Sequence, residues 1–272
     1  MPEFTDLEIV EQGETVRINC PRLSAELVQE LLGVGCHSVA WGPDQVSFLL
    51  SAGDLDRFKA IYEAGGHVTL NVPFRVIAYY DYISPFAYVS TELVKHVEAA
   101  FNIYVEWRGF ELRPRWSQYP DVAADPVRSQ ARWAMQKDTV RRWGLPIAED
   151  RPPFRLRTRT ALMASEYAKE NGRFREFQRA MYTAYYVTHE DIRDLSVIAR
   201  IAEGLGLNGT DLVSSVMERR FEQRMEQWRR EAEADLVFGV PTFKVGTTII
   251  WGREALEDLS QALEAAGAQQ RT

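Results

Sequence analysis

The sequence predicts an α/β fold with a long helical insertion, preceded by a small α+β domain. Residues 73–272 begin with a strand, helix and strand pattern and end with a strand, strand and helix pattern. The stretch between these two parts, at about 115–235, is helical in pattern and broken only by short glycine- or proline-containing turns. We expect the two ends to form one sheet, because neither half could close a core alone.

The first 72 residues form the predicted small domain. They contain 11 acidic and 4 basic residues, whereas the rest of the chain contains 28 of each. This change in charge supports a domain boundary near residue 72 and argues against a general nucleic-acid surface on the first domain. Its pattern predicts paired strands and two helices, at 7–10, 15–20, 24–32, 38–41, 45–50 and 55–64. Nothing in this domain suggests chemistry.

The composition of the whole chain indicates a globular protein. It has 272 residues, 46% of them hydrophobic, which is enough for a full core. No window has the long uncharged apolar run of a membrane helix, and the first residues lack the basic and apolar regions of a signal peptide. We therefore expect a cytoplasmic protein with no membrane partner and no nucleic-acid partner.

The second domain opens with a strand that runs directly into a helix start. Residues 74–80 are an aromatic-rich apolar run, and a short loop leads from them to Ser84 and Pro85. Serine is a good N-cap because its hydroxyl accepts a hydrogen bond from an unpaired amide, and proline suits the first helical position because it has no amide to leave unpaired. A helix N-terminus favours anions, so a thiolate or carboxylate could rest at this loop.

The remaining elements complete a recognisable order. A helix at 86–100 and a strand at 103–110 follow the first strand, and two strands at 242–245 and 248–251 precede a last helix at 253–265. A strand, helix and strand unit of this kind makes adjacent parallel strands. The order matches a thioredoxin-type fold in which a helical domain interrupts the two halves of the sheet.

The two cysteines, Cys20 and Cys36, lie in the first domain and form no C-x-x-C pair. We interpret them as small core residues, because a cytosolic protein keeps such thiols reduced. No cysteine occurs from residue 37 onward. His189 stands beside two acidic residues, but no second histidine has ligand spacing, so no metal is expected.

Several separated motifs give the chain a family resemblance. They are Asp81-Tyr-Ile-Ser-Pro-Phe-Ala87, Trp107-Arg-Gly-Phe-Glu-Leu-Arg-Pro114, Glu166-Tyr-Ala-Lys-Glu-Asn-Gly-Arg-Phe174, Gly239-Val-Pro-Thr-Phe243 and Trp251-Gly252. With these motifs in this order, residues 74–265 resemble the DsbA-like branch of the thioredoxin superfamily. That branch includes FrnE-like oxidoreductases, 2-hydroxychromene-2-carboxylate isomerases and kappa-class glutathione transferases.

The resemblance implies a site between two loops. In such folds the proline corresponding to Pro241 is usually cis, and the backbone of the preceding residue, here Val240, pairs with an extended peptide-like ligand. The Ser84 loop would face it. The positions of the C-x-x-C motif hold Ser84, Pro85, Phe86 and Ala87, so the thiols needed for disulfide exchange are absent.

The isomerase and transferase members suggest a role for the serine. There the thiolate belongs to glutathione, and a serine at this position donates a hydrogen bond to it. Carried over, Ser84 is the catalytic, thiolate-activating residue, and Val240 and Pro241 hold the cysteinyl unit. A γ-glutamyl anchor would follow the last strand, where Arg253 and Glu254 replace the Gln-Asp of the isomerases' Gly-Gln-Asp-Arg run.

Three functions remain open from the sequence. The first is a glutathione-dependent isomerase or transferase acting on a small aromatic or electrophilic substrate. The second is a redox-inactive thioredoxin-like module that binds an extended peptide or a protein partner, with Ser84 serving only as a helix cap. The third is a disulfide oxidoreductase, which the family label favours and the missing thiols oppose. Relatives are often dimers, so a homodimer is a further expectation from the resemblance.

Two other groups of side chains allow both functional and structural interpretations. Arginines in the 151–159 loop could bind ligand carboxylates or remain solvated. Aromatic residues could line a substrate pocket or pack in the core, namely Tyr79, Tyr80, Tyr82, Trp107, Trp116, Trp133, Tyr182, Tyr185 and Tyr186.

Overall fold

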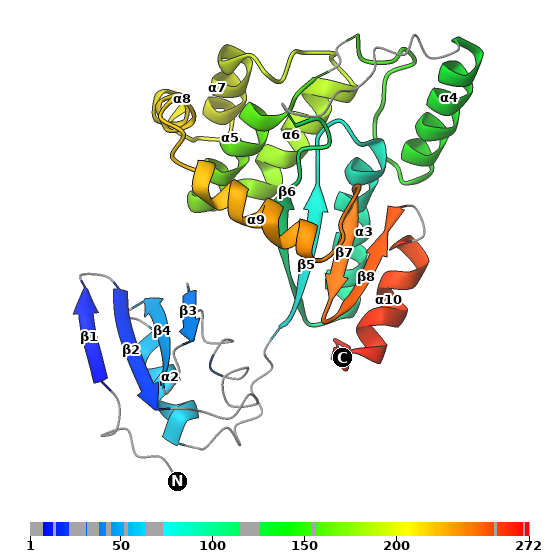
Figure 1. The fold of residues 1–272 in the computed structure, drawn as a ribbon. Helices are drawn as coiled ribbons and strands as arrows, with labels where there is room; N and C mark the ends of the chain where they lie inside the picture. Colours follow the sequence, from blue (N-terminus) through cyan, green and yellow to red (C-terminus); the bar gives the residue numbers. More distant parts are fainter. Residues whose placement is uncertain are drawn as a thin grey trace. The chain divides into compact units, whose positions relative to one another are not determined.

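The computed structural model forms two compact units, Met1–Phe74 and Arg75–Thr272 (Figure 1). The structure describes residues 8–12, 15–21, 31, 38–41, 45–51, 54–63, 73–114, 126–153, 156–252, 255–268 and 270–271.

The first unit contains an antiparallel sheet and a helix. The sheet order is β1-β2-β4-β3, with β1 (Glu8–Gln12), β2 (Thr15–Pro21), β3 (Ser38–Trp41) and β4 (Gln45–Ser51). Every pair in it is antiparallel. These strands and helix α2 (Leu55–Glu63) confirm the predicted pattern, whereas Leu31 alone is described from the helix predicted at 24–32.

Apolar side chains at alternate positions of β2 and β4 build the core of this unit. Val16, Ile18 and Cys20 are buried on one face of β2, as are Phe48 and Leu50 on β4. They pack in one cluster with the α2 residues Phe58, Ile61 and Tyr62. Burial confirms Cys20 as a core thiol; Cys36 lies outside the described residues.

The second unit is built on a mixed four-stranded sheet of order β6-β5-β7-β8. Its elements are β5 (Phe74–Tyr80), α3 (Pro85–Ala100), β6 (Ile103–Gly109), β7 (Thr242–Val245), β8 (Thr248–Trp251) and α10 (Ala255–Ala265). Strand β7 is antiparallel to both of its neighbours. In Figure 1, α3 and α10 cover one face of the sheet and α9 crosses the other. The first and last parts of the second unit thus complete one sheet, as predicted.

The predicted helical insertion is present between β6 and β7. It consists of α4 (Pro126–Arg142), α5 (Arg159–Glu170), α6 (Phe174–Tyr186), α7 (Leu195–Gly204), α8 (Gly209–Met217) and α9 (Glu222–Ala234). Side chains at the N-caps start two of these helices, where Asp194 accepts from the Ser196 amide and Asn208 from the Asp211 amide. None of the described helices is long and apolar enough to cross a membrane.

Aromatic residues join the insertion to the sheet. Tyr82 of the β5–α3 loop meets Tyr182 of α6 edge to face, with ring centroids 5.0 Å apart, and Tyr182 stacks on Tyr88 of α3 at 4.8 Å. These rings are almost completely buried, as are Tyr79, Tyr80 and Tyr186. Core packing is therefore the observed role of most of the aromatic residues singled out in the sequence. Trp116 lies outside the described residues.

Candidate functional site

The candidate site begins at the N-terminus of α3. Ser84 has an extended backbone, with φ −102° and ψ 112°, and its Oγ accepts a hydrogen bond from the Ala87 amide at 3.2 Å. Pro85 occupies the first turn of the helix. Ser84 is thus the N-cap that the sequence predicts, and the chemistry of Ser84 and Pro85 favours a helix start at this position.

The second loop of the site contains the cis Val240–Pro241 peptide bond, directly before β7. It is held by the Thr242 hydroxyl, which donates to the Gly239 carbonyl at 2.7 Å, and by the Gly252 amide, which donates to the Pro241 carbonyl at 2.9 Å. The sheet carries this loop to α3, because β7 pairs with β5, the strand that leads into the Ser84 loop.

One hydrogen bond joins the two loops across 156 residues of sequence. The Ser84 hydroxyl donates to the Val240 carbonyl oxygen at 3.1 Å. Ser84 is 6% exposed and Val240 is 7% exposed, so little water competes for this bond. Within the described part of the chain, the Val240 amide N–H has no hydrogen-bond partner. We refer to the Ser84–Val240 hydrogen bond as the clasp.

A fully buried carboxyl group supports the Ser84 loop. Asp81 accepts hydrogen bonds from the Leu112 amide at 2.8 Å and the Ile83 amide at 3.4 Å. Its backbone carbonyl accepts from the Ser84 amide at 3.2 Å. Burial raises the pKa of Asp81 to about 6, even though the hydrogen bonds from the backbone amides favour the charged carboxylate. Asp81 therefore holds the loop to the chain after β6 and titrates unusually close to neutral pH.

A second carboxyl group with a raised pKa follows β6. Burial raises the pKa of Glu111 to about 7; the Arg159 guanidinium opposes this shift and the Asp81 charge adds to it. The nearest Arg159 nitrogen is 3.9 Å from the Glu111 carboxylate, whereas Arg159 lies 2.6 Å from Glu222 and 2.7 Å from Glu226. Arg159, from the arginine-rich loop, thus anchors helix α9.

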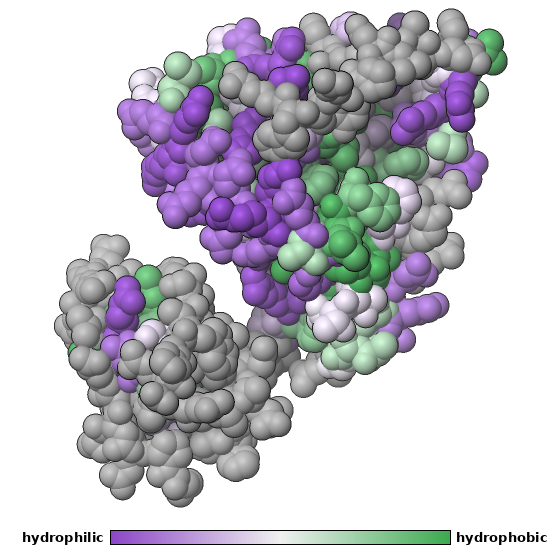
Figure 2. Space-filling model, viewed as in Figure 1, coloured by the Kyte–Doolittle hydropathy of each residue, from purple (hydrophilic) through white to green (hydrophobic). Residues whose placement is uncertain are grey.

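An exposed aromatic pair borders the Val240 loop. Phe238 is 70% exposed and Trp251 is 48% exposed, and their ring centroids lie 4.6 Å apart. A side chain at Gly239 would meet the indole nitrogen, since a Cβ built there lies 2.5 Å from Trp251 Nε1. Figure 2 shows hydrophobic residues gathered over β7 and β8, on the same edge. This edge offers an apolar contact surface next to Val240.

Arg253 and Glu254 lie outside the described residues, so the γ-glutamyl anchor stays a prediction. His189 has a positive φ of 54°. Over the described residues, no group of three or more histidine, cysteine or acidic side chains could hold a metal ion.

Sequence reasoning gave no role to Asp81, Glu111 or the Phe238–Trp251 pair, although three of these residues lie within the quoted motifs. Asp81 had a usable signal, because a charged residue directly after a buried strand is unlike its surroundings. Glu111 and Trp251 had none, since their environment depends on how β6 and β8 are placed in the sheet.

The site offers a helix N-terminus, one hydroxyl and one unpaired amide, but no thiol of its own. It can orient and stabilise an anion, and it cannot form a mixed disulfide through Ser84. Any sulfur chemistry here requires a sulfur atom supplied by a ligand.

Known proteins resemble this chain in sequence or in fold. The uncharacterized protein YwbO of Bacillus subtilis (strain 168) is 27% identical over 187 residues, which are 68% of this chain and 93% of that protein. A crystal structure of a probable DsbA oxidoreductase from Streptomyces coelicolor matches with a TM-score of 0.63 at 23% identity, covering 71% of this chain and 89% of that one. A 2-hydroxychromene-2-carboxylate isomerase matches with a TM-score of 0.58 at 19% identity, covering 70% and 95%.

A family match covers a similar share of the chain. Residues 75–264 match the DSBA-like thioredoxin domain, which is most of the chain. They include both loops of the site, with serine in place of the first thiol. The chain belongs to the DSBA-like thioredoxin domain family.

Proposed function

We propose that the second unit is a glutathione-dependent isomerase or transferase for a small aromatic or electrophilic substrate. The observation that carries this proposal is the clasp, the 3.1 Å hydrogen bond from Ser84 to the Val240 carbonyl. It brings a hydroxyl donor, a backbone acceptor and an unpaired backbone donor to one point at a helix N-terminus. A cysteinyl unit carries the complementary set, a thiolate, an amide N–H and a carbonyl.

Binding would exchange one internal hydrogen bond for three to the ligand. The Ser84 hydroxyl turns from the Val240 carbonyl to the sulfur, and the freed carbonyl accepts the cysteinyl N–H. The Val240 N–H, unpaired within the described residues, donates to the cysteinyl carbonyl. The net gain of two hydrogen bonds favours the ligand, since each contributes about 1 kcal/mol.

The same geometry would increase the acidity of the bound thiol. A helix N-terminus stabilises a nearby anion by about 0.3–1 kcal/mol, and more in a partly buried site. A hydrogen bond to a charged group adds about 1.5–3 kcal/mol, and each 1.4 kcal/mol corresponds to one pKa unit. The glutathione thiol would then be largely ionised at neutral pH, which makes it the nucleophile that the chain itself lacks.

Titration with glutathione tests this proposal. We expect glutathione to raise the melting temperature of the full chain and the thiolate absorbance near 240 nm to appear at lower pH than in free glutathione. Ser84→Ala should shift that thiolate titration upward by roughly one unit or more. S-methylglutathione, which has no ionisable thiol, serves as the ligand control and should show no titration near 240 nm with either the parent protein or Ser84→Ala.

A matched variant separates the thiolate role from helix capping. Asn208→Ala removes the N-cap of α8 in the same chemical way but far from the site in the sequence. It should lower stability and leave the thiolate titration unchanged. If glutathione at millimolar concentration causes no shift in melting temperature or absorbance, the proposal is wrong.

The exposed aromatic pair favours a second candidate, a module that binds an extended peptide. Phe238 and Trp251 would contact side chains of a strand that pairs with the Val240 backbone. In this case an unstructured, aromatic-containing peptide binds, Phe238→Ser weakens the binding, and Ser84→Ala has no effect beyond stability. Glutathione binding without a change in Phe238→Ser would contradict this second candidate.

A further inference from the structure

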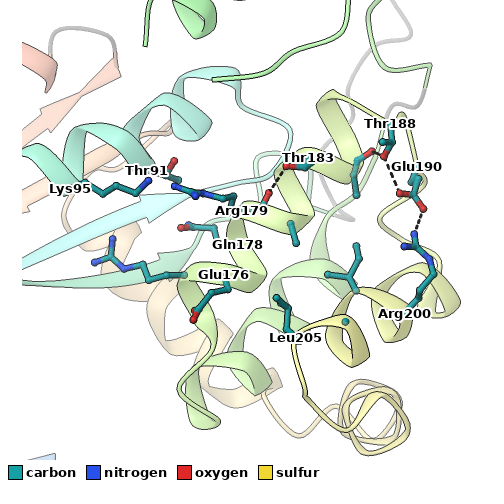
Figure 3. Close-up of a pocket in the computed structure, with 15 residues that line it drawn as sticks. Thr91, Lys95, Glu176, Gln178, Arg179, Thr183, Thr188, Glu190, Arg200 and Leu205 are labelled. Atoms are coloured by element: carbon teal, nitrogen blue, oxygen red, sulfur yellow. Dashed lines mark hydrogen bonds and ion pairs between the residues drawn. The ribbon is translucent and has the colours of Figure 1, made fainter. Parts of the chain in front are cut away.

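A cavity of about 740 Å³ lies on the helical side of the second unit, away from the Ser84 loop (Figure 3). Its floor is formed by α6, one wall by α3 and the other by α7. We call it the α6 groove. Its volume is in the range of small-molecule sites, which span about 300–1,000 Å³. None of the residues that line it belongs to the Ser84 or Val240 loops.

A buried and unpaired amide donor lines the groove. Gln178 of α6 is 1% exposed, and its Nε2 has no hydrogen-bond partner among the described residues. Buried polar groups in native proteins are nearly always paired, because an unpaired donor destabilises the fold by about 1–3 kcal/mol. In Figure 3 the Gln178 side chain extends from α6 toward the α3 side of the groove. It marks a place for an acceptor atom of a ligand.

The α3 side also has an excess of positive charge. Lys95 and Arg179 share a single acidic partner, Glu92, at 2.5 Å and 3.2 Å. The other lining charges have partners of their own, since Arg175 pairs with Glu98 and Arg200 with Glu190. Lys95 and Arg179 reach toward one another in Figure 3. A ligand carboxylate here would complete the pairing of these two cations.

Between this end and the paired Glu190 and Arg200 at the other end, the groove has an apolar floor. From the α3 side, the floor continues along Ala180 and Ala184, one helical turn apart, to Ile201 of α7 and Leu205 just after it. The two alanines leave the space that a larger side chain would fill. The groove therefore has a polar, cationic end and an apolar body.

We propose that the α6 groove binds a small amphipathic carboxylate, with its head group at Gln178, Lys95 and Arg179 and its apolar body over Ala180, Ala184 and Leu205. This site is separate from the proposed glutathione site. Thr91, the groove residue of α3 that is closest in sequence to Ser84, is seven positions away, about 10 Å along the helix.

Sodium octanoate is a suitable probe, measured by isothermal titration calorimetry on the full chain. We expect one octanoate per chain and a rise in melting temperature, with 1-octanol and octylammonium binding at least tenfold more weakly. Arg179→Gln and Gln178→Leu should each weaken octanoate binding by roughly tenfold, which corresponds to the loss of one charge-assisted or buried hydrogen bond. Arg132→Gln, an exposed arginine on α4, is the matched control and should have no effect.

The outcomes are decisive in both directions. No heat of binding up to roughly 10 mM octanoate would overturn the proposal, as would equal binding of 1-octanol. Binding that survives in Arg179→Gln and Gln178→Leu but is lost in Phe238→Ser would assign octanoate to the aromatic edge instead. Because Arg179 is exposed, its variant should fold even if a substitution at the buried Gln178 does not.

Discussion

Helix α3 borders two regions that differ in how their polar groups are satisfied. At its N-terminus the Ser84 hydroxyl accepts a hydrogen bond from the Ala87 amide and donates one to the Val240 carbonyl. Beside its middle turns, the α6 groove contains a Gln178 Nε2 with no partner in the described part of the chain and two cations that share one acid. A ligand must exchange partners at the first region, whereas it can simply add them at the second.

The two regions also differ in packing. The clasp is nearly closed to solvent, and Gly239 beside it has no room for a side chain because of Trp251. At the groove wall, a Cβ built on Gly204 meets nothing within 4 Å. Removal of a paired hydrogen-bonding group, or an added methyl group, should therefore lower stability in the closed region, whereas the open region should tolerate or even gain from the same kind of change. Four predictions test this contrast.

The largest effect concerns pH and Asp81, which supports the closed region. Its folded pKa of about 6 is above the ordinary value, so the folded state binds the proton more tightly. The stability contributed by the protonated form is complete below about pH 4 and is lost as the pH rises through about 6. The unfolding free energy lost between these two pH values is on the order of 3 kcal/mol, since each pKa unit corresponds to about 1.4 kcal/mol.

Asp81→Asn removes this titration. Denaturant unfolding of both proteins between pH 4 and pH 8 should give a difference in unfolding free energy that grows in favour of the variant as the pH rises. The change should continue toward pH 7, because the Asp81 charge also raises the pKa of Glu111. The variant's altered hydrogen bonds to Leu112 and Ile83 add only an offset. Parallel pH profiles would mean that Asp81 titrates normally.

The second prediction measures the clasp. Ser84→Ala removes a helix cap, worth about 1 kcal/mol, and leaves a buried Val240 carbonyl without its donor, worth about another 1–2 kcal/mol. Asn208→Ala removes a cap alone and should lower the unfolding free energy by about 1 kcal/mol. Equal losses in chemical denaturation would show that the bond between the two loops adds nothing to stability.

Local chemistry explains what the sequence could predict of this region. Serine and proline at 84 and 85 specify a helix start by themselves, and hydrophobic periodicity specifies the strands on both sides of the insertion. The order of these elements produces the family resemblance, and the resemblance predicts that the Ser84 and Val240 loops face each other. The hydroxyl's donation to Val240 is a long-range contact, and no local pattern encodes it.

The α6 groove could not be predicted from the sequence for a related reason. Gln178 lies in an amphipathic helix among buried aromatic residues, where a glutamine has no pattern of its own. Its missing partner follows from how α3, α6 and α7 pack, which the sequence of α6 alone does not determine. The aromatic residues illustrate the same limit, because their spacing fits a pocket and a core equally well and only packing decides between them.

The third prediction has the opposite sign to the second. Gln178→Leu replaces a buried amide, whose Nε2 has no partner among the described residues, with an apolar side chain of similar size, so the unfolding free energy of the ligand-free protein should rise by about 1 kcal/mol. Gln227→Leu, at an exposed position on α9, should change it by less than about 0.5 kcal/mol. A loss of stability in Gln178→Leu would mean that the amide already has a partner, and the groove would lose its main polar feature.

The smallest effect compares two glycines, one in each region. Gly239→Ala places a methyl group 2.5 Å from Trp251 Nε1, and the half-exposed indole must move away from it. Because the indole can shift toward solvent, we expect a loss of at most about 1 kcal/mol, together with a change in tryptophan fluorescence that is absent when the background is Trp251→Phe. Gly204→Ala adds its methyl group to open space at the end of α7, where alanine is favoured over glycine by about 0.5–1 kcal/mol. A lower melting temperature for Gly239→Ala and a higher one for Gly204→Ala would support a closed site and an open groove beside the same helix. Changes of equal sign would contradict the contrast in packing.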